Sequence, residues 1–192
     1  MENRQNLARM GIFFGNKSTS PLLSFTPQVS CPGVLSTQIV LQAKQVDPFV
    51  DAGAQVQQLI NVECVAEFYA CPVLNVRFVH NAEAVNICLQ LPLFLFKFFE
   101  AVDMPAQLFF ERWKQLNHCF FLFQLTGFGM QVLEGVDPNA DNFVAAGIIH
   151  TKTVQIGCLL RLEPKLNAFR LTVRSSRSTV ASYVCLIASE LF

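Results

Sequence analysis

The first half of the chain is a series of short apolar or alternating runs separated by turn residues. In chain order the runs are residues 10–14, 22–25, 34–42, 56–65, 73–79 and 84–91. Gly, Pro, Asn and Asp cluster at the breaks, as at Pro32-Gly33 and Asp47-Pro48. Runs of this length with turn residues between them are typical of antiparallel strands. Residues 1–95 are therefore predicted to form an antiparallel β-sandwich of the immunoglobulin-like type.

The second half opens with a helical pattern. Asp103 is placed to cap the first-turn amides, and Pro105 falls where a missing N–H costs nothing, so a helix is predicted over residues 104–116. Phe109 and Trp113 share one face of that helix, because four residues make about one turn. Two interpretations stay open. Either the pair is buried packing, or one side of the helix enters the core while Trp113 remains available to a partner.

The rest of the second half alternates between strand-like and helical patterns. In chain order it has an aromatic run at 120–123, a break at Gly127-Phe128-Gly129, a strand-like run at 130–133, a turn at Asp137-Pro138-Asn139, a short helical piece at 141–144, strands at 147–151, 154–163 and 169–173, and a final helix capped by Ser178. Residues 96–192 are therefore predicted to form an α+β unit, an antiparallel sheet flanked by helices.

Charged residues alternate with apolar ones on two of these strands. Arg161 and Glu163 share one face of the first strand. Arg170 and Arg174 share one face of the second. If the strands are neighbours and the Trp113 helix lies beside them, the surface suits an acidic, aromatic peptide, because arginine binds carboxylates and the aromatic groove accepts a ring. The alternative is an ordinary solvated strand face.

Composition narrows the class of protein. Hydrophobic residues make up 52% and charged residues 15%, which predicts a substantial core and an apolar surface. Fourteen acidic and fourteen basic residues cancel, which argues against nucleic-acid binding through a general positive field. Seven cysteines without a Cys-x-x-Cys pair indicate reduced core thiols and a cytoplasmic setting. The most apolar stretch, residues 84–99, is interrupted by Pro92 and Lys97 and is not expected to span a membrane.

Catalytic and cofactor patterns are missing from the sequence. The three histidines lie far apart without the spacing of a ligand pair, and there is neither a nucleophile elbow nor a phosphate-binding glycine loop. We therefore expect neither an enzyme nor a cofactor or metal site.

Several longer stretches closely resemble one family. They read VDP at 46–48, GAQVQQ at 53–58, FFERWKQL at 109–116, VDPN at 136–139, GIIHTKT at 147–153 and QIGCLLRLEP at 155–164. Together they resemble the C-terminal appendage, or ear, of the alpha-adaptin large subunit of the plasma-membrane clathrin adaptor. The resemblance covers nearly the whole chain, and that family has a β-sandwich subdomain followed by a platform subdomain.

The resemblance implies a protein-interaction module of clathrin-mediated endocytosis and intracellular protein transport. It would act at coated pits on the cytoplasmic face of the plasma membrane, together with other adaptor subunits. Its partners would be endocytic accessory proteins carrying Asp-Pro-Phe, Asp-Pro-Trp or Phe-x-Asp-x-Phe motifs. The platform pocket of the family maps onto Phe109 and Trp113 as aromatic walls and onto a polar rim of Arg161, Glu163, Arg170 and Arg174. A second site, for Trp-x-x-Phe motifs on the sandwich, maps onto Phe13, Gly15 and Gln55.

The sequence departs from the family pattern in three places, the smallest of which is a slightly shorter loop at residues 164–169. The family has further sandwich strands before the segment that begins at Arg4, and here they are absent. Between Leu116 and Gly127 the chain is shorter and more apolar than the family, which has a second helix, a strand and a rim carboxylate there. The alternative interpretation is therefore a truncated, decayed copy of the same fold with little or no peptide binding.

Overall fold

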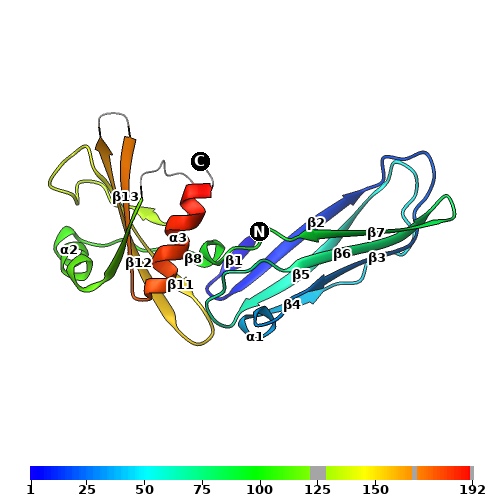
Figure 1. Cartoon of the computed structure of the whole chain (residues 1–192), viewed down its shortest axis with the longest axis horizontal. Coiled ribbons are helices and arrows are strands. Elements are labelled where there is room, and N and C mark those ends of the chain that lie inside the picture. Colours follow the sequence, from blue (N-terminus) through cyan, green and yellow to red (C-terminus); the bar gives the residue numbers. More distant parts are fainter. Residues whose placement is uncertain (122–128, 166–167, 191–192) are drawn as a thin grey trace. The chain divides into compact units, whose positions relative to one another are not determined.

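The computed structural model describes residues 1–121, 129–165 and 168–190 (Figure 1). The chain divides into two compact units, Met1–Phe94 and Leu95–Phe192, which are described separately below. Among the described residues, no helix combines the length and the apolar character that crossing a membrane requires.

The first unit consists of two antiparallel sheets. One sheet has the order β1-β2-β5-β4, with β1 (Glu2–Arg4), β2 (Leu7–Gly15), β5 (Gln55–Cys64) and β4 (Ile39–Ala43). The other has the order β3-β6-β7, with β3 (Leu23–Ser30), β6 (Val73–His80) and β7 (Glu83–Gln90). Every neighbouring pair is antiparallel, and the predicted antiparallel sandwich is confirmed.

The two sheets enclose one apolar core. Phe25, Leu74 and Val76 from the second sheet are buried in it, and Phe14 of β2 packs against them. The rings of Phe14 and Phe25 meet edge to face with centroids 5.2 Å apart. Because successive strand residues point to opposite faces, packing Phe14 against this core turns its neighbour Phe13 outward, away from the core.

The predicted strand at 34–42 is wrong in its first half. The structure has a short helix, α1 (Leu35–Gln38), followed by β4 from Ile39. The hydroxyl groups of Ser36 and Thr37 donate to the carbonyl oxygens of Gly33 and Val34, three residues earlier. These local bonds favour a helical turn over an extended strand.

The second unit is an antiparallel sheet with a helix on each face (Figure 1). Within the described residues the strand order is β10-β11-β12-β13-β9, with β8 also pairing β11. The strands are β8 (Phe99–Ala101), β9 (Asn117–Phe121), β10 (Gln131–Val132), β11 (Phe143–His150), β12 (Gln155–Lys165) and β13 (Ala168–Ser175). The helices are α2 (Ala106–Gln115), α3 (Ser178–Glu190) and the 3-10 turn η1 (Leu95–Phe98). The predicted sheet with flanking helices is confirmed.

Two local predictions in this unit are wrong, and one strand was missed. The helical piece at 141–144 is wrong, because Asp141 ends a turn held by Asn139 and β11 starts at Phe143. Helix α2 starts at Ala106 with Pro105 as its N-cap and no side-chain cap, so Asp103 does not have the predicted role. Strand β9, which pairs with β13, was not predicted. The remainder of the aromatic run, at 122–123, and the break at 127–128 lie outside the described residues.

The cysteines whose side chains are described are free thiols. Cys64, Cys158 and Cys185 are buried, as predicted for core residues. Burial raises the pKa of Cys64 and of Cys158 to about 12, so both stay protonated and unreactive at neutral pH. Cys88 is exposed, so the prediction of a core thiol is wrong at this position.

Candidate functional site

Helix α2 places one aromatic residue in the core and a second at the surface. Phe109 is fully buried against Val144 and Leu159 of the sheet. Trp113 lies one turn later and is only half-buried. The two rings stack, with centroids 5.6 Å apart and planes inclined by 19°. The structure thus matches the second of the two interpretations, in which the core holds Phe109 while part of Trp113 faces solvent.

The strand register brings the predicted polar residues together on the face that α2 covers. Glu163 of β12 lies opposite Arg170 of β13. Leu159 lies opposite Arg174, and Leu159 packs under α2. Since residues two apart on a strand share a face, Arg161 belongs to the same surface. We call the six residues Phe109, Trp113, Arg161, Glu163, Arg170 and Arg174 the arginine–aromatic surface.

Arg174 joins the sheet to the C-terminal end of α2. Its guanidinium carbon lies 4.6 Å from the centre of the Trp113 ring, a cation–π contact. Its Nη1 donates to the carbonyl oxygen of Trp113 and, at 3.5 Å, to that of Leu116. Both carbonyls lie at the last turn, where a helix lacks internal donors. The sequence pattern gave no indication of this capping role, because the partners are about sixty residues apart.

Burial affects the pKa of Arg174 and the groups that balance its charge. Desolvation lowers its pKa, although an arginine remains a cation at any physiological pH. Its Nε is buried and has no hydrogen-bond partner among the described residues. No carboxylate pairs with Arg174 within the same set of residues, so its charge is balanced only by dipoles and the tryptophan ring.

The other charged residues form a connected network. Arg170 Nε lies 2.5 Å from a Glu163 oxygen, and Arg161 Nη1 lies 3.3 Å from the other. The hydrogen bond from Arg170 is the largest cause of the lowered pKa of Glu163, and the nearby arginine charges add to it. Glu163 is therefore ionised and fixed between two guanidinium groups.

Asp137 is a member of this network that sequence analysis did not identify. Its carboxylate accepts from Arg161 Nε at 2.7 Å, from the Asn139 amide at 3.0 Å and from Asn142 Nδ2 at 3.0 Å. Burial opposes ionisation, but these hydrogen bonds outweigh it, and the pKa of Asp137 is lowered. The sequence showed Asp137 only as a turn residue, because Arg161 lies 24 residues further along the chain.

The network leaves the arginine–aromatic surface with an excess of positive charge. Among the described side chains, three guanidinium groups face two carboxylates, those of Asp137 and Glu163. The side chain of Arg170 is 42% exposed, so a ligand can reach it from solvent. The arrangement is suited to binding an anion next to an aromatic ring.

The second predicted set lies on the outer face of the first unit. Gly15 and Gln55 are directly opposite each other on β2 and β5, and Phe13 lies two residues along β2 on the same face. Phe13 is 61% exposed. Apart from Gly15 and its two chain neighbours, no atom of the described residues lies within 4 Å of the position that a Gly15 Cβ would occupy, so the backbone there is open to a ligand. The structure therefore brings all three residues together.

Comparison with known proteins places the chain in a family. A family described as "Alpha adaptin AP2, C-terminal domain" matches residues 117–192, and one described as "Adaptin C-terminal domain" matches residues 1–90. The chain belongs to the alpha-adaptin C-terminal appendage family. The resemblance noted from the sequence is thereby confirmed, and an appendage of this family is a non-catalytic protein-interaction module.

Curated relatives of the appendage come from three different organisms. The AP-2 complex subunit alpha-2 of Dictyostelium discoideum is 28% identical over 205 residues, which cover 95% of this chain. The AP-2 complex subunit alpha of Schizosaccharomyces pombe is 31% identical over 166 residues, covering 76%. The AP-2 complex subunit alpha-1 of Arabidopsis thaliana is 27% identical over 180 residues, covering 84%. The matched region makes up 20%, 19% and 17% of these relatives, so the chain corresponds to about a fifth of each.

Proposed function

We propose that this appendage binds short acidic and aromatic linear motifs through its arginine–aromatic surface. The observation that carries the proposal is the position of Arg174, which lies over the half-buried Trp113 without a carboxylate partner among the described residues. A ligand carboxylate would supply the missing negative charge, and a ligand ring would pack on the exposed part of Trp113. Motifs of the Asp-Pro-Phe, Asp-Pro-Trp and Phe-x-Asp-x-Phe types provide both groups.

The arginine side chains of this surface are already held in place, which supports recognition of a ligand by fixed groups. Arg161 is held by Asp137, Arg170 by Glu163, and Arg174 by two helix carbonyls. These contacts reduce the side-chain entropy that would otherwise be lost on binding. A short peptide with few contacts benefits most from a surface that is already arranged.

The outer face of the first unit supports a second, weaker proposal. Phe13 presents an exposed ring, Gly15 leaves the backbone accessible, and Gln55 offers an amide that donates and accepts hydrogen bonds. This uncharged combination suits an aromatic motif of the Trp-x-x-Phe type. Within the cell, we propose that the appendage recruits endocytic accessory proteins as part of an AP-2 clathrin adaptor at the cytoplasmic face of the plasma membrane, in clathrin-mediated endocytosis.

Trp113 is the single tryptophan of the chain, which makes the first proposal directly testable. Titrating a synthetic Asp-Pro-Phe peptide, which itself lacks tryptophan, should change the fluorescence of Trp113 in a saturable way. The same peptide with Asp and Phe replaced by Ala serves as the control and should have no effect. An appendage that gives no response and no heat of binding would instead match the alternative of a decayed copy without peptide affinity.

A further inference from the structure

The appendage contains, in its own first unit, a sequence of the kind that its second unit is proposed to bind. The loop between β4 and β5 reads Asp47-Pro48-Phe49. All three residues are exposed, and 49% of the surface of Phe49 is accessible. We propose that this turn binds the arginine–aromatic surface of a second copy of the chain. The inference rests on the proposed function of that surface.

The turn has the form of a preformed ligand. The Phe49 amide donates to Asp47 Oδ1 at 2.9 Å, an Asx turn that sets the aspartate and the aromatic ring in a fixed relation. No salt bridge engages Asp47 within the part of the chain that the structure describes. Its carboxylate charge is therefore still available to a cation of a partner molecule.

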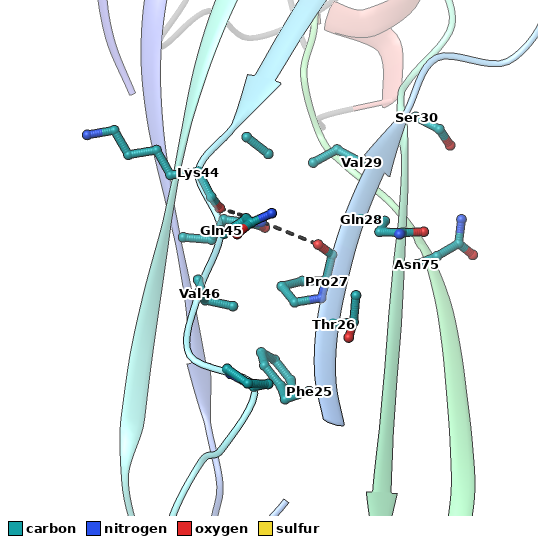
Figure 2. A pocket seen from close by; sticks show the side chains of 13 residues that line it. Phe25, Thr26, Pro27, Gln28, Val29, Ser30, Lys44, Gln45, Val46 and Asn75 are labelled. Atoms are coloured by element: carbon teal, nitrogen blue, oxygen red, sulfur yellow. Dashed lines mark hydrogen bonds between the residues drawn. The ribbon is translucent and has the colours of Figure 1, made fainter. Parts of the chain in front are cut away.

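Hydrogen bonds hold the loop on both sides of the motif, so the turn is fixed in place at the surface of the first unit. Figure 2 shows the segment from Lys44 to Val46 running beside β3. Residues of both segments line a pocket of about 650 Å³. Gln58 Nε2 donates to the carbonyls of Lys44, at 3.1 Å, and Pro27, at 3.3 Å, which appear as the dashed lines in Figure 2.

Backbone bonds complete the anchoring around the motif itself. The Phe25 amide donates to the Pro48 carbonyl at 2.8 Å. Val50, which is buried, exchanges two backbone hydrogen bonds with Leu22, of 2.9 and 3.0 Å. The Phe49 ring and the second carboxylate oxygen of Asp47 take no part in the bonds named above. A turn fixed in this way loses little conformational entropy when it docks.

The charges of the turn and the surface are complementary. Asp51 is exposed and follows Phe49 by two residues, so two carboxylates flank one accessible ring. The arginine–aromatic surface carries the opposite excess, three guanidinium groups to two carboxylates among the described side chains. Association would bring Asp47 or Asp51 toward Arg170 and Arg174, with the Phe49 ring toward Trp113.

The assembly that forms depends on the fact that the turn and the arginine–aromatic surface are two different patches of the chain. Each copy carries one turn and one surface, and these are different patches, so the contact between copies is head to tail. Such a contact extends to chains or rings with rising concentration. It also competes with motifs of other proteins for the same surface, so proteins that carry such motifs should dissociate the assembled copies.

Sedimentation velocity over a concentration series tests the proposal. We expect the wild-type chain to associate and Phe49→Ala to associate at least about tenfold more weakly. Asp47→Asn keeps the Asx acceptor but removes the charge and should weaken association too. Val34→Ala is the control, since Val34 is 75% exposed on the same unit and lies outside the motif. A wild-type chain that stays monomeric, or a Phe49→Ala variant that associates like wild type, would overturn the proposal.

A mixing experiment links the two partners of the contact. Phe49→Ala keeps the surface and Trp113→Ala keeps the turn, so neither should associate alone, while their mixture should stop at a one-to-one complex. Arg170→Glu, at an exposed position, replaces Trp113→Ala if the latter loses its fold. Absence of this complex counts against the inference.

A separate titration distinguishes failure of this inference from failure of the proposed function. A free Asp-Pro-Phe peptide is titrated against Phe49→Ala, which has no motif of its own. Peptide binding without self-association of the wild type would reject the built-in ligand and leave the proposed function intact. No peptide binding would reject both.

Discussion

The two candidate sites of the appendage are built in opposite ways. The arginine–aromatic surface consists of charged side chains that hold one another, through Asp137, Glu163 and the end of α2. The outer face of the sandwich offers an exposed Phe13 and, at Gly15, open space where another residue would carry a side chain. The residues of the first site therefore also stabilise the second unit. The residues of the second site lie outside the core of the first unit, and its stability does not depend on them. Substitutions should separate the two.

The largest effect on the second unit is expected for Asp137→Ala. The Asp137 side chain is 2% exposed, and removing it leaves the Arg161 guanidinium without its main partner. We expect the free energy of unfolding of the second unit to fall by about 3 kcal/mol. Urea denaturation followed by Trp113 fluorescence reports this unit. Asp141→Ala, an exposed aspartate of the same turn, is the control and should change the free energy of unfolding by less than about 0.5 kcal/mol.

In the sandwich, a substitution at the candidate site should weaken peptide binding without lowering the stability of the unit. Phe13→Ala should change the free energy of unfolding of the first unit by less than about 0.5 kcal/mol, because most of this residue is exposed to solvent. It should nevertheless weaken binding of a Trp-x-x-Phe peptide by about 2 kcal/mol. Phe14→Ala, one residue along and packed on Phe25, should instead cost about 3 kcal/mol of stability. Equal stability losses for the two variants, measured by circular dichroism, would contradict the outward placement of Phe13.

A smaller effect on the stability of the second unit is expected at acidic pH. The pKa values of Asp137 and Glu163 are lowered in the folded state from 3.8 and 4.5. Their ionised forms therefore stabilise the fold above these ordinary values, and that contribution is lost as the pH falls through the lowered pKa values. We expect the second unit to lose stability below about pH 4.5. Glu163→Gln should flatten this dependence, and a variant with the wild-type pH profile would show that the network does not control it.

The parts of this molecule that could be predicted are those with a local pattern. The 3.6-residue period placed Phe109 and Trp113 on one helix face, and the two-residue period placed Arg161 with Glu163 and Arg170 with Arg174. What could not be predicted depends on contacts distant in sequence. Strand β9 exists through its pairing with β13, and Asp137 matters through Arg161.

Local competition explains the errors in the fold. The strand expected at 34–42 begins as a helix because Ser36 and Thr37 bond back to the preceding turn, which an apolar period does not reveal. Helix α2 starts later than expected, because Pro105 is its N-cap and no side chain caps it. Periodicity therefore gives the identity of an element more securely than its ends.

We propose that Trp113 and Arg174 together form the binding site for acidic and aromatic motifs. Isothermal titration calorimetry with an Asp-Pro-Phe peptide tests it most directly, on the wild type, Trp113→Ala, Arg174→Lys and the exposed control Lys114→Ala. We expect Trp113→Ala to weaken binding by about 2 kcal/mol or more. Arg174→Lys keeps the charge but loses the planar group over the ring, and should also weaken binding, while Lys114→Ala should not. Peptide affinity that is the same in all four proteins would contradict the claim.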